Sequence, residues 1–207
     1  MLTITNIDTY GWRAAIRGMR NPMNSWDKMD SVIDTSRLEI GPNDIHLMKL
    51  LNASGDDHGK FARMITITMD ILAPLYWWKE FDTYKVGTVA NSCSTMHKIS
   101  AKEFDISDFS HDHLNKDSEK VLLDVIDILN HYRDMYKAYG AKEYWWQMIQ
   151  MLPSSYNQLR TVQLNYQVAK RIYEARKNHK LDEWRTFNKT LKGLPYARIL
   201  IVGDDDE

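Results

Sequence analysis

The chain has 207 residues, of which 43% are hydrophobic and 27% are charged, and its formal net charge is −1. This length suits one domain over residues 1–207 better than two small domains, and the composition does not indicate disorder. The near-neutral charge argues against a nucleic-acid partner, and the single cysteine excludes a disulfide framework or a cysteine-based zinc site. No apolar run is long enough to cross a bilayer and residues 1–10 do not resemble a signal peptide. We therefore expect a cytoplasmic protein without a membrane partner.

The periodicity of the apolar residues predicts strands and helices along the whole chain. In order, these are a strand at 2–10, a helix at 11–20, a strand at 36–40, a helix at 42–51, a strand from 64, a helix after Pro74, and helices at 120–139, 141–152, 154–178 and 180–193. An acidic tail at 204–207 closes the chain. The pattern predicts an α+β fold with an antiparallel or mixed sheet and a helical C-terminal half.

The helix predicted at 11–20 carries three arginines, Arg13, Arg17 and Arg20. Beside an Asn/Ser-rich loop, such arginines could hold a phosphate, although a solvated face is the more common interpretation. A second local pattern, His111 and His113, could bind a metal if a third ligand joined it. Asp112 is the only adjacent carboxylate, so we expect no metal.

We expect the functional site in residues 64–99. The stretch begins with strict alternation that places Ile65, Ile67, Met69 and Ile71 on one face, which predicts a half-buried strand. Pro74 then suits the first turn of a helix, and a small-residue segment, VGTVANSCST, follows as a predicted loop. A strand, a helix and an exposed loop in succession are a common base for ligand sites.

Three segments carry a resemblance to a known family. The first, HGKFARMITITMDILAP at residues 58–74, is similar to a histidine-containing turn that leads into a strand ending in Ala-Pro. The second is the helix and loop after Pro74, where the family has Arg-His-Arg and, seven residues later, Ser. The third, at residues 152–184, is similar to a Leu-Pro helix followed by an inward-facing Asn and a Leu-Arg-Ala-x-x-His-like ending. Together they cover about half of the chain and resemble the flavin-dependent thymidylate synthases, also called thymidylate synthase complementing proteins.

The signature motif of that family is degenerate here. Aligned from Pro74, the Arg-His-Arg positions fall on Thr83, Tyr84 and Lys85, and the Ser position falls on Cys93. Lysine in place of arginine loses the planar guanidinium that grips a phosphate through two hydrogen bonds. The chain therefore resembles a divergent member of the family.

The resemblance implies roles for individual residues. The implied catalytic residues are Cys93 and Lys85. The implied cofactor-binding residues are His58, Arg63, Tyr84, Lys85, Asn165 and His179. The implied substrate-binding residues are Glu80, Cys93, Ser94, Arg160 and Arg176.

The implied activity is the methylation of dUMP to dTMP, or a related pyrimidine-nucleotide reaction. It would use FAD as the cofactor, with methylenetetrahydrofolate and NADPH as co-substrates, in a homotetramer. Because the flavin carries the difficult chemistry, the protein need not supply a strong nucleophile. The alternative is a non-catalytic homologue that kept the fold as a nucleotide-binding or structural protein and lost the flavin chemistry.

Simpler interpretations exist for several of these residues. Cys93 could be a packing residue, and Arg176 could complement the dipole of a helix C-terminus. Asn165 is more informative, because an asparagine on a helix face spaced for core packing needs a polar partner. The pairs Trp77-Trp78 and Trp145-Trp146 are expected in the core or an interface rather than around a flavin.

Overall fold

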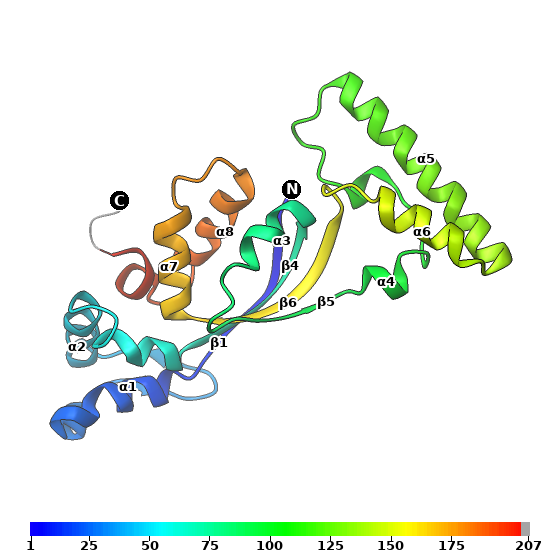
Figure 1. Cartoon of the computed structure of the whole chain (residues 1–207). Coiled ribbons are helices and arrows are strands. Elements are labelled where there is room, and N and C mark those ends of the chain that lie inside the picture. Colours follow the sequence, from blue (N-terminus) through cyan, green and yellow to red (C-terminus); the bar gives the residue numbers. More distant parts are fainter. Residues whose placement is uncertain (204–207) are drawn as a thin grey trace. The chain divides into compact units, whose positions relative to one another are not determined.

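The computed structural model describes residues 1–203, so the acidic tail at 204–207 lies outside the described residues. The fold is α+β with an antiparallel sheet, as the sequence predicts. Four strands form the main sheet in the order β1-β4-β6-β5 (Figure 1), and their bounds are β1 Thr3–Tyr10, β4 Thr66–Pro74, β6 Asn157–Asn165 and β5 Val89–Ser92. A second, two-stranded antiparallel sheet pairs β2 (Val32–Ile33) with β3 (Leu38–Glu39), with Val32 opposite Glu39.

The alternation in β4 is confirmed. The four apolar residues that alternate through this stretch have no exposed surface, whereas the residues between them are half-buried. This is the pattern of a strand with one face in the core. Pro74 ends the strand, and helix α3 (Leu75–Phe81) begins at the next residue. The predicted burial of Trp77 and Trp78 is also confirmed, and both indoles pack against Phe81 at centroid distances of 5.1 and 5.4 Å.

Contacts divide the chain into two compact units, which are described separately. The α5 unit comprises Met1–Thr3, Ile71–Thr83 and Asn91–Thr161. The α7 unit comprises Ile4–Asp70, Tyr84–Ala90 and the residues from Val162 onward. Strands of the main sheet have residues in both units. The expectation of a single domain stays a prediction.

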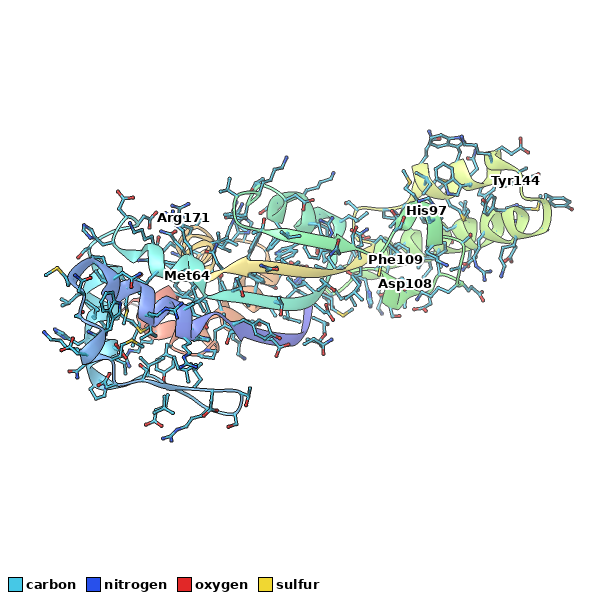
Figure 2. The ribbon with its side chains drawn as sticks, turned by 90° about the horizontal axis from the view of Figure 1, so that it is seen from below. Met64, His97, Asp108, Phe109, Tyr144 and Arg171 are labelled. Carbon is cyan, nitrogen blue, oxygen red and sulfur yellow. The ribbon has the colours of Figure 1, made fainter. Side chains whose placement is uncertain are left out.

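The α5 unit is built around two long helices that pack on each other, α5 (Lys116–Tyr139) and α6 (Lys142–Met151). Asn115 caps α5 by accepting a hydrogen bond from Ser118 N–H, and Gly140 ends it with φ +68°, a conformation that favours glycine. The helices bury one core cluster, in which Phe109 (labelled in Figure 2) is fully buried. The other buried members are Ile99, Phe104, Leu122, Ile126, Leu129 and Met148. The remaining elements of this unit are α3, α4 (Thr95–Lys98) and the 3-10 turn η4 (Ile106–Asp108).

In the α7 unit, helix α7 (Tyr166–Arg176) packs against helix α8 (Asp182–Lys192) and the turns η3 (Gly59–Met64) and η5 (Arg198–Val202). At the start of α1, the Trp12 ring lies 5.1 Å from that of Tyr166 and 5.6 Å from that of Tyr196. The elements of this unit, besides the strands, are α1 Trp12–Arg20, η1 Asn21–Met23, η2 Trp26–Lys28, α2 Pro42–Ala53, η3 Gly59–Met64, α7, α8 Asp182–Lys192 and the π-helical turn η5 Arg198–Val202. No helix in residues 1–203 combines the length and apolarity that crossing a bilayer requires.

Two local predictions are wrong. The helix predicted over 154–178 is strand β6 up to Asn165 and helix α7 only from Tyr166. Val162 and Leu164 are buried while Gln163 is exposed, so the true period before Asn165 is two residues. The loop predicted over 86–95 contains strand β5 and the first residue of α4.

Arg20 is a buried structural residue. Its Nε lies 2.6 Å from the Asp44 carboxylate, and the two side chains are 4% and 0% exposed. The carboxylate also accepts hydrogen bonds from the hydroxyl and N–H of Ser31. Arg20 is therefore not available to a phosphate, whereas Arg13 and Arg17 are exposed.

Candidate functional site

Two of the predicted cofactor-binding residues, Arg63 and Asn165, line one cavity in the α7 unit. The cavity, called here the Asn165 cavity, has a volume of about 320 Å³. Its other lining residues are Thr66, Gly87, Thr88, Val89, Gln163 and Leu164. The chain thus places a guanidinium, a carboxamide and two threonine hydroxyls around a small space, which suits a polar ligand. The Thr88 hydroxyl donates to the Tyr84 carbonyl, so toward a ligand it acts as an acceptor.

Asn165 owes its position to the junction between β6 and α7. Its Oδ1 accepts a hydrogen bond from Val168 N–H at 3.0 Å, so it is the N-cap of the helix. The partner that the sequence requires for this asparagine is therefore a backbone group. Gly87 approaches it closely: with φ +81°, an added Cβ would lie 2.9 Å from Val168 Cγ2 and 3.1 Å from Asn165 Nδ2. Only glycine fits this approach without strain.

Arg63 and His58 lie in the segment that precedes β4. The Arg63 guanidinium donates to Gln167 Oε1, and Gln167 Nε2 donates to the Asp56 carbonyl at 3.2 Å. These contacts tie the end of turn η3 to α7. His58 stands just before η3 and is exposed, and it does not line the Asn165 cavity.

Tyr84, Arg176 and His179 gather around Trp184 in the α7 unit. Arg176 Nε donates to the Tyr84 hydroxyl at 2.9 Å, and its guanidinium carbon lies 4.9 Å from the Trp184 ring centroid. The His179 ring lies 6.2 Å from the same indole. A cation over an aromatic face is attracted to the π electrons, which orients Arg176. Lys85, next to Tyr84, is exposed.

Cys93 and Ser94 line a cavity of about 210 Å³ in the α5 unit, called here the Cys93 cavity. The Cys93 thiol side chain is exposed, while its backbone is held by strand β6: its N–H donates to Leu159 O at 2.9 Å, and its carbonyl accepts from Gln158 Nε2 at 2.8 Å. Ser94 caps the short helix α4 by accepting from His97 N–H. Residues 93–95 of the predicted loop therefore form one side of this cavity.

Arg160 and Glu80 do not line the Cys93 cavity. The guanidinium carbon of Arg160 lies 4.2 Å from the Trp78 ring centroid, and its nitrogens donate to Gln158 Oε1 at 3.0 Å and to Asp82 at 2.8 Å. Glu80 is half-buried on α3, and its carbonyl accepts from the Thr83 hydroxyl. Their predicted contacts with a nucleotide stay predictions.

Sequence reasoning missed Asn157, which also lines the Cys93 cavity and is 7% exposed. Residues 154–178 fit a helical period, and an asparagine near the start of a helix is commonly exposed or a cap. The sequence pattern therefore did not predict that Asn157 is buried. A strand prediction for β6 would have indicated a buried polar side chain at Asn157, which needs a hydrogen-bond partner.

The histidine pair lies in the α5 unit. The Nδ1 atom of His111 makes a 2.8 Å hydrogen bond with the Phe109 carbonyl, and Asp112 pairs with the N-terminal amine at 2.6 Å. No group of three His, Cys, Asp or Glu side chains in residues 1–203 is arranged to hold a metal ion.

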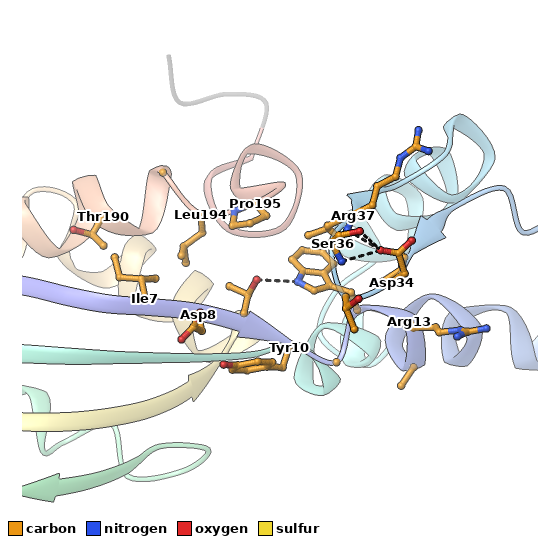
Figure 3. A pocket seen from close by; sticks show the side chains of 18 of the residues that line it. Ile7, Asp8, Tyr10, Arg13, Asp34, Ser36, Arg37, Thr190, Leu194 and Pro195 are labelled. Carbon is orange, nitrogen blue, oxygen red and sulfur yellow. Dashed lines mark hydrogen bonds between the residues drawn. The ribbon is translucent and has the colours of Figure 1, made fainter.

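A further cavity, with a volume of about 1150 Å³, lies elsewhere in the α7 unit (Figure 3). It is lined by the end of β1, the start of α1, the β2–β3 turn and the end of α8. Figure 3 shows Ile7 directed toward Leu194 and Thr190, with Tyr10 on the opposite face of β1. Arg13, one of the three arginines considered for a phosphate, is among its lining residues. None of the residues to which the resemblance assigns a catalytic, cofactor-binding or substrate-binding role is among the described residues that line it.

No protein-family model matches the sequence, and no curated protein matches it significantly. Solved structures do share its fold. Thymidylate Synthase X (ThyX) from Helicobacter pylori, crystallised with FAD and dUMP, aligns with a TM-score of 0.68 and 16% identity over 99% of this chain and 98% of its own. A second structure of the Helicobacter pylori enzyme, also complexed with FAD and dUMP, aligns with a TM-score of 0.70 and 16% identity over 98% of this chain and 100% of its own.

The UMP/dUMP methylase PolB from Streptomyces cacaoi, bound with 5-Br dUMP, aligns with a TM-score of 0.63 and 13% identity over 96% of this chain and 91% of its own. At these identities, the comparison establishes the fold and not the activity. The chain therefore has the fold of flavin-dependent thymidylate synthases, over nearly its whole described length.

Proposed function

We propose that this protein is an FAD-dependent enzyme that methylates dUMP to dTMP, with methylenetetrahydrofolate and NADPH as co-substrates. One observation supports the proposal above all. The same fold spans nearly the whole chain in proteins crystallised with FAD and dUMP or with a brominated dUMP. Fold alone does not carry function, so the proposal also depends on whether the residues present suit these ligands.

The Asn165 cavity suits part of a flavin nucleotide. Arg63 offers a charged donor, Thr88 a hydroxyl, and Gly87 a backbone without a Cβ in a place where a Cβ would be crowded. A volume of about 320 Å³ is at the lower end for ligand pockets, which suits a ring system or a phosphate rather than a whole dinucleotide. On this proposal, Arg63 and Asn165 hold the FAD, with Tyr84, Lys85, His58 and His179 as further contacts.

The chemistry that a bound, reduced flavin would supply at this site is hydride transfer. The residues of this chain would bind and orient the reactants. Cys93 and Ser94, which line the Cys93 cavity, would contact the substrate. Lys85, an exposed cation next to Tyr84 in the sequence, would act with Cys93 as a catalytic residue. Arg176 and Arg160 are proposed as nucleotide contacts together with Glu80. Each of these arginines already has aromatic and polar partners, which keep the guanidinium oriented before a ligand arrives.

One observation favours the alternative, a non-catalytic nucleotide-binding homologue. Tyr84 stands at the position of the signature histidine, and its hydroxyl accepts a hydrogen bond from Arg176. The cation expected to bind the nucleotide is thus already engaged within the protein. A homologue without flavin chemistry would tolerate this substitution, whereas an enzyme must release or share Arg176 when the substrate binds.

A visible absorption spectrum separates the two functions. The purified protein is titrated with FAD and then with dUMP. For the enzyme, we expect a bound flavin spectrum that dUMP perturbs, and dTMP formation when NADPH and methylenetetrahydrofolate are supplied. A protein that takes up no FAD, whether or not dUMP is present, contradicts the enzymatic proposal and supports the alternative.

A further inference from the structure

Asn157 is a buried carboxamide without a hydrogen-bond partner. Its residue exposure is 7%, and neither Nδ2 nor Oδ1 has a partner in the part of the chain that the structure describes. Buried amides are almost always satisfied, because losing both water and protein partners is costly. A buried amide that is unsatisfied in the protein alone is therefore a candidate for a ligand contact.

The Cys93 cavity, which Asn157 lines, has the walls that a small planar ring needs. Leu72, Ile99 and Tyr156 supply apolar surface, while Cys93 and Asn157 supply polar groups. Burial raises the pKa of the Tyr156 phenol, so this wall stays uncharged near neutral pH. With a volume of about 210 Å³, the cavity suits a single heterocycle and not a whole nucleotide.

The neighbouring amide, Gln158, is already fully used. Its Nε2 donates to the Cys93 carbonyl, and its Oε1 accepts from Arg160 Nε. Asn157 differs, because its side-chain amide makes no hydrogen bond that a rotation would break. Rotation of the amide about χ2 is also easy, since this torsion has a broad distribution in asparagine. Within this cavity, Asn157 is the amide that is available to a ligand.

A carboxamide offers one acceptor and one donor side by side, so its natural complement is an edge with an adjacent N–H and C=O. We propose that Asn157 is a specificity-determining residue that pairs with the imide edge of a pyrimidine ring in the Cys93 cavity. This inference rests on the proposed function, which supplies the uracil nucleotide as the ligand. Two lysines, Lys98 and Lys102, also line the cavity. Lys102 pairs with Asp108 (labelled in Figure 2), whereas Lys98 has no ion pair within residues 1–203 and could bind the phosphate of the nucleotide.

The test is calorimetric binding of dUMP to the full-length protein, with and without saturating FAD. We expect Asn157→Ala to weaken dUMP binding at least tenfold. We expect N3-methyl-dUMP, which lacks the imide N–H, to bind the wild-type protein more weakly than dUMP does. On the Asn157→Ala background the same methyl group should cause no further loss, because the pairing is already absent.

A second variant is needed in case the void created by Asn157→Ala destabilises the protein enough to unfold it. Asn157→Leu has nearly the same shape and removes the two unsatisfied polar atoms, so it should fold with stability equal to or above that of the wild type. We expect it to bind dUMP at least tenfold more weakly all the same. A purely structural role would move stability and binding in the same direction.

Asn188 provides the matched control. It is 5% exposed, both of its side-chain polar atoms likewise lack partners in residues 1–203, and it lies on α8 and does not line the Cys93 cavity. Asn188→Ala should leave dUMP binding within twofold of the wild type. Equal dUMP affinities of the wild type and both Asn157 variants overturn the inference and leave the proposed function standing. If the wild type binds no dUMP with or without FAD, both are wrong.

Discussion

Tyr84 is where a single residue most alters the expected site. In the aligned signature this position is histidine, and the two neighbouring positions are arginines, so the pattern concentrates positive charge. Here the Tyr84 hydroxyl instead accepts a hydrogen bond from Arg176. The Arg176 guanidinium also makes cation–π contacts with the Tyr84 ring and with the Trp184 ring. The positive charge is thereby carried by α7 and held by aromatic rings rather than by the signature segment.

The buried pair of Arg20 and Asp44 yields a prediction about stability. Asp44→Ala should lower the free energy of unfolding by about 3–5 kcal/mol, because the Arg20 guanidinium would be left buried without its carboxylate. Chemical denaturation measures this change. Arg37→Ala is the control, since Arg37 and its partner Glu39 are 57% and 59% exposed and their pair should contribute less than about 1 kcal/mol. Equal effects of the two substitutions would show that Asp44 is not a structural anchor.

The titration of Asp34 yields a prediction about pH. Hydrogen bonds from the N–H and the hydroxyl of Ser36, with a further one from Arg37 N–H, hold the pKa of Asp34 below its ordinary value of 3.8. Since the carboxylate is favoured in the folded turn, its contribution is present above that value and is lost as the pH falls through the folded pKa. Carbon-detected NMR should show Asp34 titrating below 3.8, and Ser36→Ala should move the midpoint upward. A midpoint at or above 3.8 in the wild type contradicts this assignment.

At the scale of elements, the junction of β6 and α7 determines where Asn165 lies in the Asn165 cavity. The strand ends and the helix begins at one residue, and that residue is both the helix cap and a wall of the cavity. The two roles can be separated by substitution, because serine caps a helix about as well as asparagine but lacks the carboxamide.

We therefore expect different results from two variants at this junction. Asn165→Ala should lower the free energy of unfolding by about 1 kcal/mol and weaken FAD binding, since it removes both the cap and the amide. Asn165→Ser should keep the stability of the wild type within a few tenths of a kcal/mol and still weaken FAD binding. Thermal unfolding and flavin fluorescence titration measure the two quantities. If the serine variant binds FAD as the wild type does, Asn165 serves only as a cap.

The sequence predicted the elements whose periodicity is unambiguous. Strand β4 alternates without exception, and α5 has its cap, apolar stripe and terminal glycine in the expected order. Strand β6 was missed because Leu159 and Val162 are three residues apart, which is a helical spacing. In the strand these two residues lie on opposite faces, with Leu159 41% exposed and Val162 buried. The Asn165 cavity was not predictable as a cavity, because Arg63 and Asn165 are far apart in sequence and only the tertiary fold brings them to one space.

At the scale of the whole molecule, the fold is shared with the compared enzymes far more completely than the sequence is. The chain follows the fold of the compared enzymes almost from end to end at 13% and 16% identity. Core positions accept many apolar side chains of suitable volume, so a fold persists through changes that would alter a site. If the proposed function is correct, the segment around Tyr84 contacts the ligands and has no such freedom, so substitutions there would change ligand binding more than folding.

We also propose that the protein assembles as a homotetramer, as the resemblance implies. Apolar side chains that remain exposed on the single chain are compatible with this, among them Val121, Leu123 and Ile128 on α5. Native mass spectrometry should then give about four times the chain mass of 24.3 kDa. A single species of 24.3 kDa at micromolar concentration would contradict the proposal.

The exposed thiol at Cys93 has a practical consequence. Because the sequence contains one cysteine, a maleimide dye would attach to the unmodified protein at a single position, on the rim of the cavity that Asn157 lines. The natural chain therefore comes with a built-in attachment point for a fluorescent reporter. A ligand that fills this cavity should slow the reaction of the dye with the thiol, so the rate of labelling would report occupancy without any engineered residue.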